Sequence, residues 1–196
     1  MTKPKPKFDV VVIDPPWGAD CGQGGSRGAG NHYQTMNLNQ IKELPINELT
    51  KDDSWLFLWV TNASLPHAFD LLEGWGFTYR SLITWNKLRL GLGSYYFRNA
   101  TEHLIFATKG KKYLPDRRLI NWYLAPTSRH SQKPKLFLDM IDRIAKGQRC
   151  LELFARERTF PHWSYWGNEI DSDVILPKFP VPKYSPNPID FRKETA

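Results

Sequence analysis

The stretch Phe8-Asp9-Val10-Val11-Val12-Ile13-Asp14-Pro15-Pro16-Trp17 decides how this chain of 196 residues is interpreted. Its first six residues form a largely apolar run of strand length, and two prolines follow after one aspartate. Proline fixes its own φ and restricts the residue before it, so the strand cannot continue through the pair. The stretch therefore predicts a buried strand that ends in a carboxylate, a rigid turn and an indole ring.

The turn Asp14-Pro15-Pro16-Trp17 has the composition of a site that orients an aromatic amine. The exocyclic amine of adenine is a poor nucleophile because its lone pair is delocalised. The Asp14 carboxylate and a backbone carbonyl of the prolines can accept its two hydrogens, and Trp17 can stack on an extruded base. A purely structural strand-and-turn is the better interpretation of a Pro-Pro pair alone, and only the motifs further along the chain reverse that preference.

Apolar runs and helical patterns alternate along the chain, which predicts an α/β fold. Continuous apolar runs are typical of strands covered on both faces in a parallel or mixed sheet. Ligands bind such doubly wound domains beyond the carboxyl ends of the strands. The further runs are Trp55 to Val60, Ser81 to Trp85, His103 to Thr108, Arg149 to Phe154 and Ser164 to Gly167; the helical patterns are Ala63 to Trp75, Pro134 to Lys146 and a shorter one near Asn39.

The length and the 41% hydrophobic content predict one domain. We place it at residues 8–176, after a flexible basic amino terminus at residues 1–7. Residues 177–196 contain five prolines and are expected to wrap or trail as an extended tail. Residues Gly18 to Tyr33 contain six glycines and suggest a mobile flap, with a linker as the alternative. They contain no Gly-x-x-x-x-Gly-Lys-Ser/Thr phosphate loop.

Charge is concentrated in the middle of a chain whose formal net charge is +7. Residues 87–135 hold eleven Lys and Arg against two acidic residues, which favours a polyanionic partner over a merely solvated face. Interleaved aromatic residues add surfaces on which bases can stack. The candidate nucleic-acid contacts are Trp17, Tyr33, Lys87, Arg89, Tyr95, Tyr96, Arg98 and Arg129.

The cysteine pattern excludes several classes of protein. Cys21 and Cys150 form neither a metal-ligand spacing nor a Cys-x-x-Cys pair, so we expect no metal and a reducing compartment. No apolar stretch reaches about 18 residues. The sequence thus predicts an intracellular, cytoplasmic protein without a membrane segment.

Seven more motifs accompany the proline turn, and their joint occurrence is more specific than any one of them. They are Tyr33-Gln34-Thr35-Met36, Leu56-Phe57-Leu58-Trp59-Val60-Thr61, Ile83-Thr84-Trp85-Asn86-Lys87, Glu102-His103, Ser131-Gln132-Lys133-Pro134, Glu152-Leu153-Phe154-Ala155-Arg156 and Trp163-x-x-x-Gly167-Asn168-Glu169. With these motifs, residues 7–172 resemble the MT-A N6-adenine methyltransferase family. That family includes the catalytic subunit of the eukaryotic messenger-RNA adenosine methyltransferase and related phage and bacterial DNA enzymes.

The resemblance implies a Rossmann-like fold, with a mixed, mostly parallel sheet flanked by helices, that binds S-adenosylmethionine. It implies that Lys133 neutralises the cofactor's carboxylate and that Asp14 lies near its amino group. By itself, Lys133 would be interpreted as an ordinary solvated lysine. The positions that match the family's ribose site are Arg156, Thr159, Asn168 and Glu169. A carboxylate at Glu169 can accept from both ribose hydroxyls.

The chain departs from the family pattern in one loop. Ala155 stands where glycine is usual, and Arg158-Thr159 replaces a His-Asn pair, with one residue fewer before Trp163. The proline turn is intact, whereas it is typically degraded in the silent partner subunits of the family. The departures therefore concern the ribose contacts, and the intact turn favours an active enzyme.

From these features we expect methyl transfer to the N6 amine of adenine, with Asp14, Pro15, Pro16 and Trp17 as the catalytic residues. DNA is the preferred substrate because the chain is small and lacks the zinc fingers of the messenger-RNA enzymes. RNA is the alternative, because phosphate attraction is common to both. A silent nucleic-acid-binding subunit also stays open, and a homodimer or a heterodimer with a related subunit is expected.

Overall fold

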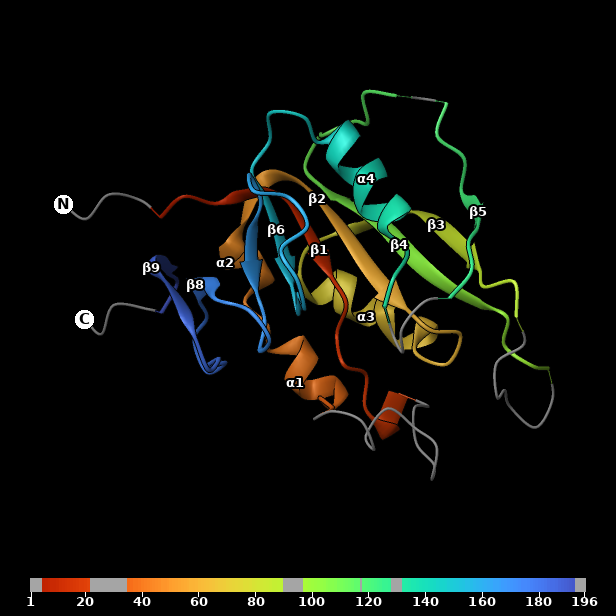
Figure 1. Cartoon of the computed structure of the whole chain (residues 1–196), viewed down its shortest axis with the longest axis horizontal. Coiled ribbons are helices and arrows are strands. Elements are labelled where there is room, and N and C mark those ends of the chain that lie inside the picture. Colours follow the sequence, from red (N-terminus) through yellow and green to blue (C-terminus); the bar gives the residue numbers. More distant parts are fainter. Residues whose placement is uncertain (1–4, 22–34, 90–96, 117, 128–131, 193–196) are drawn as a thin grey trace.

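A seven-stranded sheet forms the centre of the computed structural model, which describes residues 5–21, 35–89, 97–116, 118–127 and 132–192 (Figure 1). The strand order is β5-β3-β4-β2-β1-β6-β7. The strands are β1 (Phe8–Ile13), β2 (Thr50–Val60), β3 (Thr78–Asn86), β4 (Thr101–Lys109), β5 (Trp122–Leu124), β6 (Cys150–Leu153) and β7 (Ser164–Trp166). Only β4 pairs antiparallel to its neighbours, so the sheet is mixed and mostly parallel, as expected.

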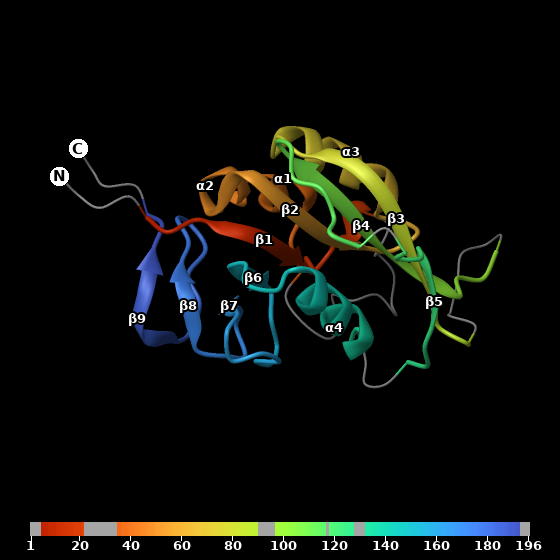
Figure 2. The same cartoon turned by 90° about the horizontal axis from the view of Figure 1, so that it is seen from above.

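Helices cover both faces of this sheet (Figure 2). One face carries α1 (Leu38–Lys42), α2 (Ile46–Leu49) and α3 (Leu65–Gly74), and the other carries α4 (Lys135–Ile144). A single 3-10 turn, η1 (Ala19–Cys21), follows the proline turn. The arrangement of helices around a mostly parallel sheet is consistent with the Rossmann-like methyltransferase fold.

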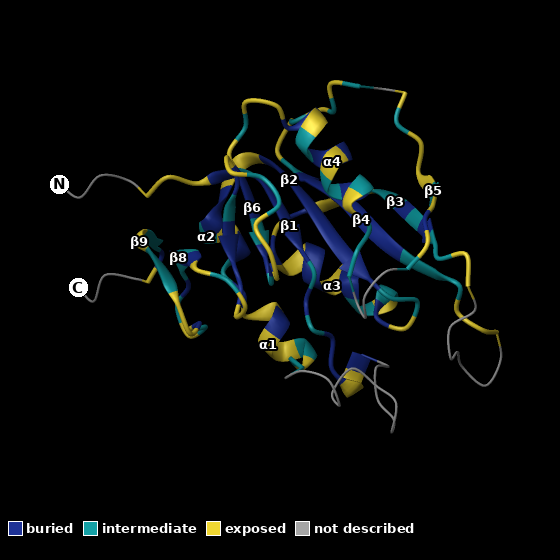
Figure 3. Ribbon diagram, viewed as in Figure 1, coloured by how far each residue is buried: buried dark blue, intermediate teal, exposed yellow. Residues whose placement is uncertain are grey.

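The apolar runs of the central strands are buried because alternate side chains enter two different cores. On the α3 side, Val11 and Ile13 of β1 pack with Ala68 and Leu71. On the α4 side, Val10 and Val12 pack with the cluster that contains Phe137. The central strands β1, β2 and β4 are consequently buried over most of their length, apart from residues 51–53 of β2, whereas α1 and α4 each expose one side to solvent (Figure 3).

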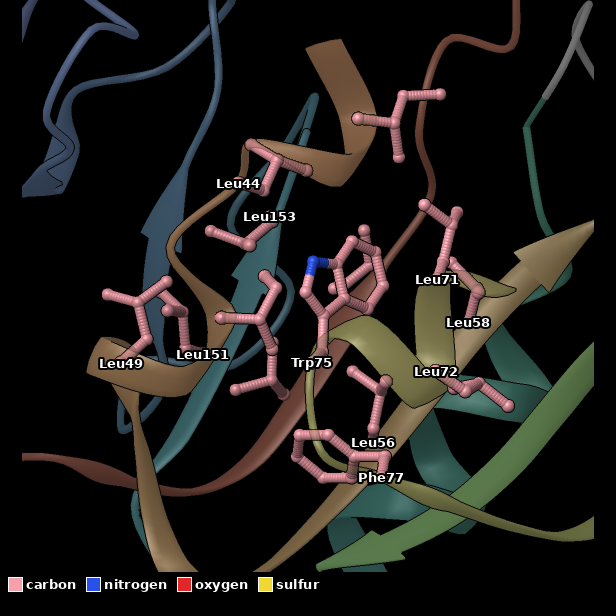
Figure 4. Packing of buried hydrophobic residues seen from close by; sticks show 14 of the residues in the cluster. Leu44, Leu49, Leu56, Leu58, Leu71, Leu72, Trp75, Phe77, Leu151 and Leu153 are labelled. Atoms are coloured by element: carbon pink, nitrogen blue, oxygen red, sulfur yellow. The ribbon is translucent and has the colours of Figure 1, made fainter. Parts of the chain in front are cut away.

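The α3-side core is built mainly from aliphatic side chains that interlock between helix and sheet (Figure 4). The α4-side core is more aromatic. Phe137 of α4 lies edge-on to Trp59 at 4.9 Å between ring centroids and to Tyr123 at 5.4 Å. Such edge-to-face pairs stabilise a core beyond the area that they bury. They also fix the position of α4, whose first turn follows Lys133.

The helix ends follow from local sequence. Asn37 caps α1 through a capping box, in which its side chain accepts from the Gln40 N–H while the Gln40 side chain accepts from the Asn37 N–H. Pro134 precedes the first residue of α4, and Gly147 stands three residues after its end with φ of 77°. Glycine adopts this left-handed conformation without steric cost, so the predicted stop at Gly147 agrees with the structure.

The proline-rich carboxyl segment packs against the domain. Within it, β9 (Tyr184–Asp190) pairs in parallel with β8 (Ser172–Ile175), and Phe191 is buried against Phe8. The segment therefore wraps in the range that we assigned to an extended tail. The division of the chain at residues 8 and 177 stays a prediction.

Gly167 makes the closest backbone approach near the end of β7. A β-carbon at this position would lie 2.0 Å from the carbonyl oxygen of Ala155, in the loop that follows β6. The same loop is held to β7 by the hydrogen bond from the Ala155 N–H to the Trp166 carbonyl, 3.0 Å long. A side chain at residue 167 would thus separate the two strand ends.

We predict that Gly167→Ala lowers the free energy of unfolding by about 3 kcal/mol, because backbone atoms would have to move. Gly74→Ala is the matched control. Its β-carbon would meet nothing nearer than the Lys42 side chain at 3.7 Å, so alanine in this helix should be neutral or stabilise by about 0.5–1 kcal/mol. Urea unfolding of both variants measures the difference, and equal effects would contradict the prediction.

Candidate active site

The sheet brings most of the sequence motifs to one edge, the catalytic edge. The carboxyl ends of β1, β3, β6 and β7 meet there because these strands are parallel (Figure 1). Because β4 runs the other way, its amino end lies at the same edge, and Glu102 pairs with Trp85 of β3. Asp14 follows β1 near the middle of this edge, at the position where doubly wound sheets bind ligands.

Four charged side chains form a continuous row at this edge. The Lys133 Nζ donates to both carboxylate oxygens of Asp14, at 2.9 and 2.7 Å, and lies 3.6 Å from Glu102. Glu102 also forms an ion pair with Lys87. We call Asp14, Lys133, Glu102 and Lys87 the ionic row. Its lysine and glutamate side chains are 16–22% exposed, so these charges interact with little screening by water.

The two carboxylates of the row have opposite pKa shifts. Desolvation raises the pKa of Asp14, and the ammonium of Lys133 offsets this only in part, although 35% of the Asp14 side chain is still exposed. Burial also raises the pKa of Glu102, but Lys133 and Lys87 together outweigh it and hold that pKa below the ordinary value. Glu102 is thus the fixed anion of the row, and Asp14 is the member that gains or loses a proton more readily.

The proline turn is held from both sides. The Pro15 carbonyl accepts from the Trp17 N–H at 2.9 Å, and the Pro16 carbonyl accepts from the Met36 N–H at 2.8 Å. Each carbonyl oxygen has a second lone pair that can accept another donor. The turn therefore presents carbonyls in fixed directions next to Asp14.

Trp17 has a different position from the one we expected. Its side chain is 5% exposed, packs in the α3-side core, and donates from its indole nitrogen to the Trp59 carbonyl at 3.1 Å. A ring enclosed in this way has no open face on which a base can stack. In this structure, Trp17 instead anchors the proline turn to β2.

The residues matched to the ribose site lie at the ends of β6 and β7. Arg156 Nε donates to Glu169 at 2.7 Å, and both side chains are more than half exposed. Arg156 lies close enough to lower the pKa of Asp14, so this pair belongs to the same edge. Thr159 is half-buried and Asn168 is exposed, and no interaction joins either of them to the ionic row in the part of the chain that is described.

The divergent loop after β6 is anchored by its own contacts. Arg158 pairs with Asp173 at 2.9 Å, donates to the Asp171 carbonyl and lies over the Tyr165 ring. The Tyr165 hydroxyl accepts from the Phe160 N–H and donates to the Phe160 carbonyl. Arg158 is thus engaged in holding the loop against β7 and β8.

Glu152 is a charged residue inside the otherwise apolar β6. It pairs with Val12 and Tyr165, and its Oε2 is buried without a hydrogen-bond partner among the described residues. Burial raises the pKa of Glu152 to about 8, and the charges of Asp14 and Glu157 add to this. A buried acceptor without a donor is costly and marks a site where a ligand can supply the missing donor.

The basic stretch that is continuous in sequence is divided in space. Lys87, Arg89 and Arg98 lie at or beyond the catalytic edge, where Arg89 donates to Thr127 and Arg98 is exposed. Lys109, Lys111 and Lys112 follow the opposite end of β4. An open hollow lined by Pro115, Asp116, Arg118, Arg143 and Ile144 lies at that opposite end too. The predicted contacts Tyr33, Tyr95, Tyr96 and Arg129 lie outside the described residues.

Sequence reasoning gave no role to Glu102 or Glu152, although both stood in quoted motifs. An acidic residue inside a buried apolar run was the available signal for Glu152, since unpaired glutamate is rarely buried. Glu102 had no such signal, because its place at the edge depends on the antiparallel direction of β4.

Among the described residues, no group of three His, Cys, Asp or Glu side chains is arranged to hold a metal, and no helix is long and apolar enough to span a membrane.

The residues at the catalytic edge fit S-adenosylmethionine. The cofactor carries an α-carboxylate, an α-ammonium group, a sulfonium and a ribose diol. Lys133 can neutralise the carboxylate, Asp14 can accept from the ammonium, and Glu169 can accept from the diol. The set contains both signs of charge, as binding of this molecule requires.

Comparison with known proteins agrees with this fit. The MT-A70 family matches residues 8–169. The type II methyltransferase M.MunI of Mycoplasma sp is 30% identical over 89% of this chain and 83% of its own length. The N(6)-adenosine-methyltransferase subunit METTL3 of Danio rerio is 30% identical over 87% of this chain, and the N(6)-adenine-specific methyltransferase METTL4 of Mus musculus is 32% identical over 83%.

The chain spans 29% of that METTL3 and 37% of that METTL4, so those matches concern one domain of longer proteins. The M.MunI match covers most of both chains. The family match includes the proline turn, β4 and the strand ends that carry Arg156 and Glu169. This chain belongs to the MT-A70 family of methyltransferases.

Proposed function

We propose that the protein transfers a methyl group from S-adenosylmethionine to the N6 amine of adenine in a polynucleotide, with DNA as the preferred substrate. The observation that carries the proposal is the intact Asp14-Pro15-Pro16 turn at the catalytic edge, with Asp14 held by Lys133. Three relatives whose names specify a methyltransferase share this domain. The family includes N6-adenine methyltransferases, which supports the choice of acceptor.

The chain's own residues orient the amine. A carboxylate has about four acceptor positions, so Asp14 can accept an amine hydrogen while Lys133 stays beside it. The remaining lone pair of the Pro15 carbonyl can accept the other hydrogen. The nitrogen lone pair is then directed away from these acceptors, and this orientation lowers the barrier without a strong base.

When bound, the cofactor supplies an electrophilic methyl group on a positively charged sulfur. The amine nitrogen forms its bond to the methyl carbon while the carbon–sulfur bond breaks, and that electron pair stays on sulfur. The methylated nitrogen then loses one proton to water. Lys133 and Glu102 keep Asp14 in place during these events, since Lys133 lies just before α4 and Glu102 belongs to β4.

The share of each chain that M.MunI covers supports our preference for DNA over RNA. The match to M.MunI covers 89% of this chain, which agrees with the compact DNA-modifying enzyme that we expect. The METTL3 match favours RNA as the second candidate. Lys87, Arg89 and Arg98 would contact phosphates in either case, because such contacts carry no information on the sugar or the sequence.

A partner subunit is part of the proposal. Ile120, Trp122 and Leu124 alternate along the edge strand β5 and its approach, and each is 48–62% exposed. Exposed apolar residues next to one another mark an interaction surface. A related subunit or a second copy of this chain is the occupant we propose, and the relative METTL3 is itself named as a subunit.

A methyl-transfer assay with isotopically labelled S-adenosylmethionine tests the reaction and the substrate together. We expect labelled N6-methyldeoxyadenosine from adenine-containing DNA, because the compact domain matches M.MunI over most of its length. Single- and double-stranded DNA and RNA of the same sequence are compared by nucleoside mass spectrometry. Labelled N6-methyladenosine from RNA alone would move the assignment to the second candidate, and cofactor binding without any product would favour a silent subunit.

Asp14→Asn should lower kcat by roughly 10³-fold, because the amide presents one acceptor in place of the carboxylate and loses the pairing with Lys133. Lys133 would keep Glu102 as a partner, so the variant should fold. Asp139→Asn, which changes an exposed carboxylate on α4, is the matched control and should leave kcat unchanged. A fully active, folded Asp14→Asn protein would rule out this mechanism.

Lys133→Met should shift the pH dependence of kcat. Asp14 must be ionised to accept the amine hydrogens, so activity is lost as pH falls through its folded pKa, which lies above 3.8. Lys133 is the largest influence that lowers this pKa, and its removal should move the acid limb to higher pH. Lys135→Met, on an exposed lysine, is the control. An unchanged acid limb in Lys133→Met would contradict the assigned role.

A further inference from the structure

We propose that Glu152 binds the α-ammonium group of S-adenosylmethionine together with Asp14 and releases a proton as it does so. The inference rests on the proposed function, because it concerns the cofactor of that reaction. It adds a binding residue and a coupling between cofactor binding and protonation that the ribose and carboxylate contacts do not provide.

The first step of the argument is the position of Glu152. In the sheet it lies beside Val12 of β1, and paired residues on neighbouring strands point to the same face. Asp14 comes two residues after Val12, so its side chain lies on this face as well. The two carboxylates therefore face the same space at the catalytic edge, and the charge of Asp14 raises the pKa of Glu152.

The second step is the unpartnered oxygen. Oε2 of Glu152 is buried and accepts no hydrogen bond within the described residues, whereas both oxygens of Asp14 accept from Lys133. A charged carboxylate in this situation lacks a donor and a neighbouring cation. A group with three N–H donors and a positive charge satisfies both needs, and the cofactor's ammonium is such a group.

The third step concerns the proton. The ionisable groups that face Glu152 are Asp14 just after β1, Glu157 of the loop after β6 and Tyr165 of β7. Burial, Asp14 and Glu157 raise the pKa of Glu152 to about 8. Without ligand, Glu152 is therefore mostly protonated at pH 7. A bound ammonium favours the ionised form, so binding must release this proton.

Isothermal titration calorimetry measures the release directly. S-adenosylhomocysteine, which keeps the ammonium and lacks the sulfonium, is titrated at pH 7 into the full chain in two buffers of different ionisation enthalpy. The wild type should release close to one proton per ligand. Glu152→Gln should lose most of this release and bind roughly tenfold more weakly, since an amide replaces the carboxylate. Asp139→Asn, at an exposed carboxylate on α4 that does not contribute to the pKa shift of Glu152, should release as much as the wild type.

A second ligand identifies the group that Glu152 binds. 5′-Methylthioadenosine has the nucleoside but no amino-acid part, so its affinity should be the same for the wild type and Glu152→Gln, and Glu152 should release no proton when it binds. Equal proton release by the wild type and Glu152→Gln with S-adenosylhomocysteine would overturn the assignment of Glu152 while the cofactor site stands. Failure of the wild type to bind S-adenosylhomocysteine would overturn the proposed function as well.

A ligand-free measurement shows that the variant folds and that the charge is buried. The folded chain holds the Glu152 proton more tightly than the unfolded chain, so this residue lowers the stability of the wild type progressively from about pH 4.5 to about pH 8. The Glu152→Gln variant has no ionisable group at this position and does not lose stability in this way. Its melting temperature should therefore exceed that of the wild type by a margin that widens over this range, and a constant margin would contradict the buried charge on which the proposal depends.

Discussion

The parallel pairing of β1 with β2 on one side and β6 on the other is the constraint on which the structure depends. It places a six-residue strand in the middle of the sheet with both faces buried. The side chains from Val10 to Ile13 pack alternately into the α4-side core and the α3-side core. Asp14 is the first residue beyond these contacts. Its position is consequently determined by the packing of the whole sheet, and the two prolines only set the direction in which the chain leaves.

Electrostatics at the catalytic edge follow from this placement. Asp14 is desolvated because the central strand ends among neighbours, and its charge is sustained by Lys133, which arrives from the segment before α4. Glu102 arrives from β4 and holds that lysine from the other side. Three distant parts of the sequence therefore cooperate in the state of one carboxylate, and the geometry depends on the aromatic packing of Phe137 that fixes α4.

The sequence predicted the strands well because a strand with both faces buried leaves a continuous apolar run. It could not predict the direction of β4, since the run His103 to Thr108 has the same composition read either way, and the position of Glu102 was missed for that reason. The basic stretch, residues 87–135, is not one surface in space for a related reason. β4 lies within it and crosses the sheet, so the charged residues before β4 and those after it lie at opposite ends of the sheet. The local sequence could not show that Trp17 is buried, because its indole is held by the Trp59 carbonyl, 42 residues further along the chain. For that reason Trp17 was assigned to base stacking.

Short elements were missed for different physical reasons. β5 has only the three residues Trp122, Tyr123 and Leu124, and so short an apolar run does not indicate a strand. β9 contains Pro186 and Pro188, which lack the N–H that a central strand needs, and it is tolerated because it pairs with β8 outside the main sheet. Within the site, Asp14 and Lys133 were identified through motifs, whereas Glu152 required knowledge of which of its oxygens has no donor.

Lys5 and Arg192 lie together at the side of the molecule near β9, where the Lys5 ammonium donates to the Arg192 carbonyl at 2.7 Å (Figure 2). A peptide that joined these two residues would be short, and the chain could then be opened in any exposed loop without breaking a strand pairing. The fold therefore requires the cyclic order of the motifs, and it does not require that the proline turn come first. Circular permutants of the chain that begin in an exposed loop are therefore compatible with the same strand pairings.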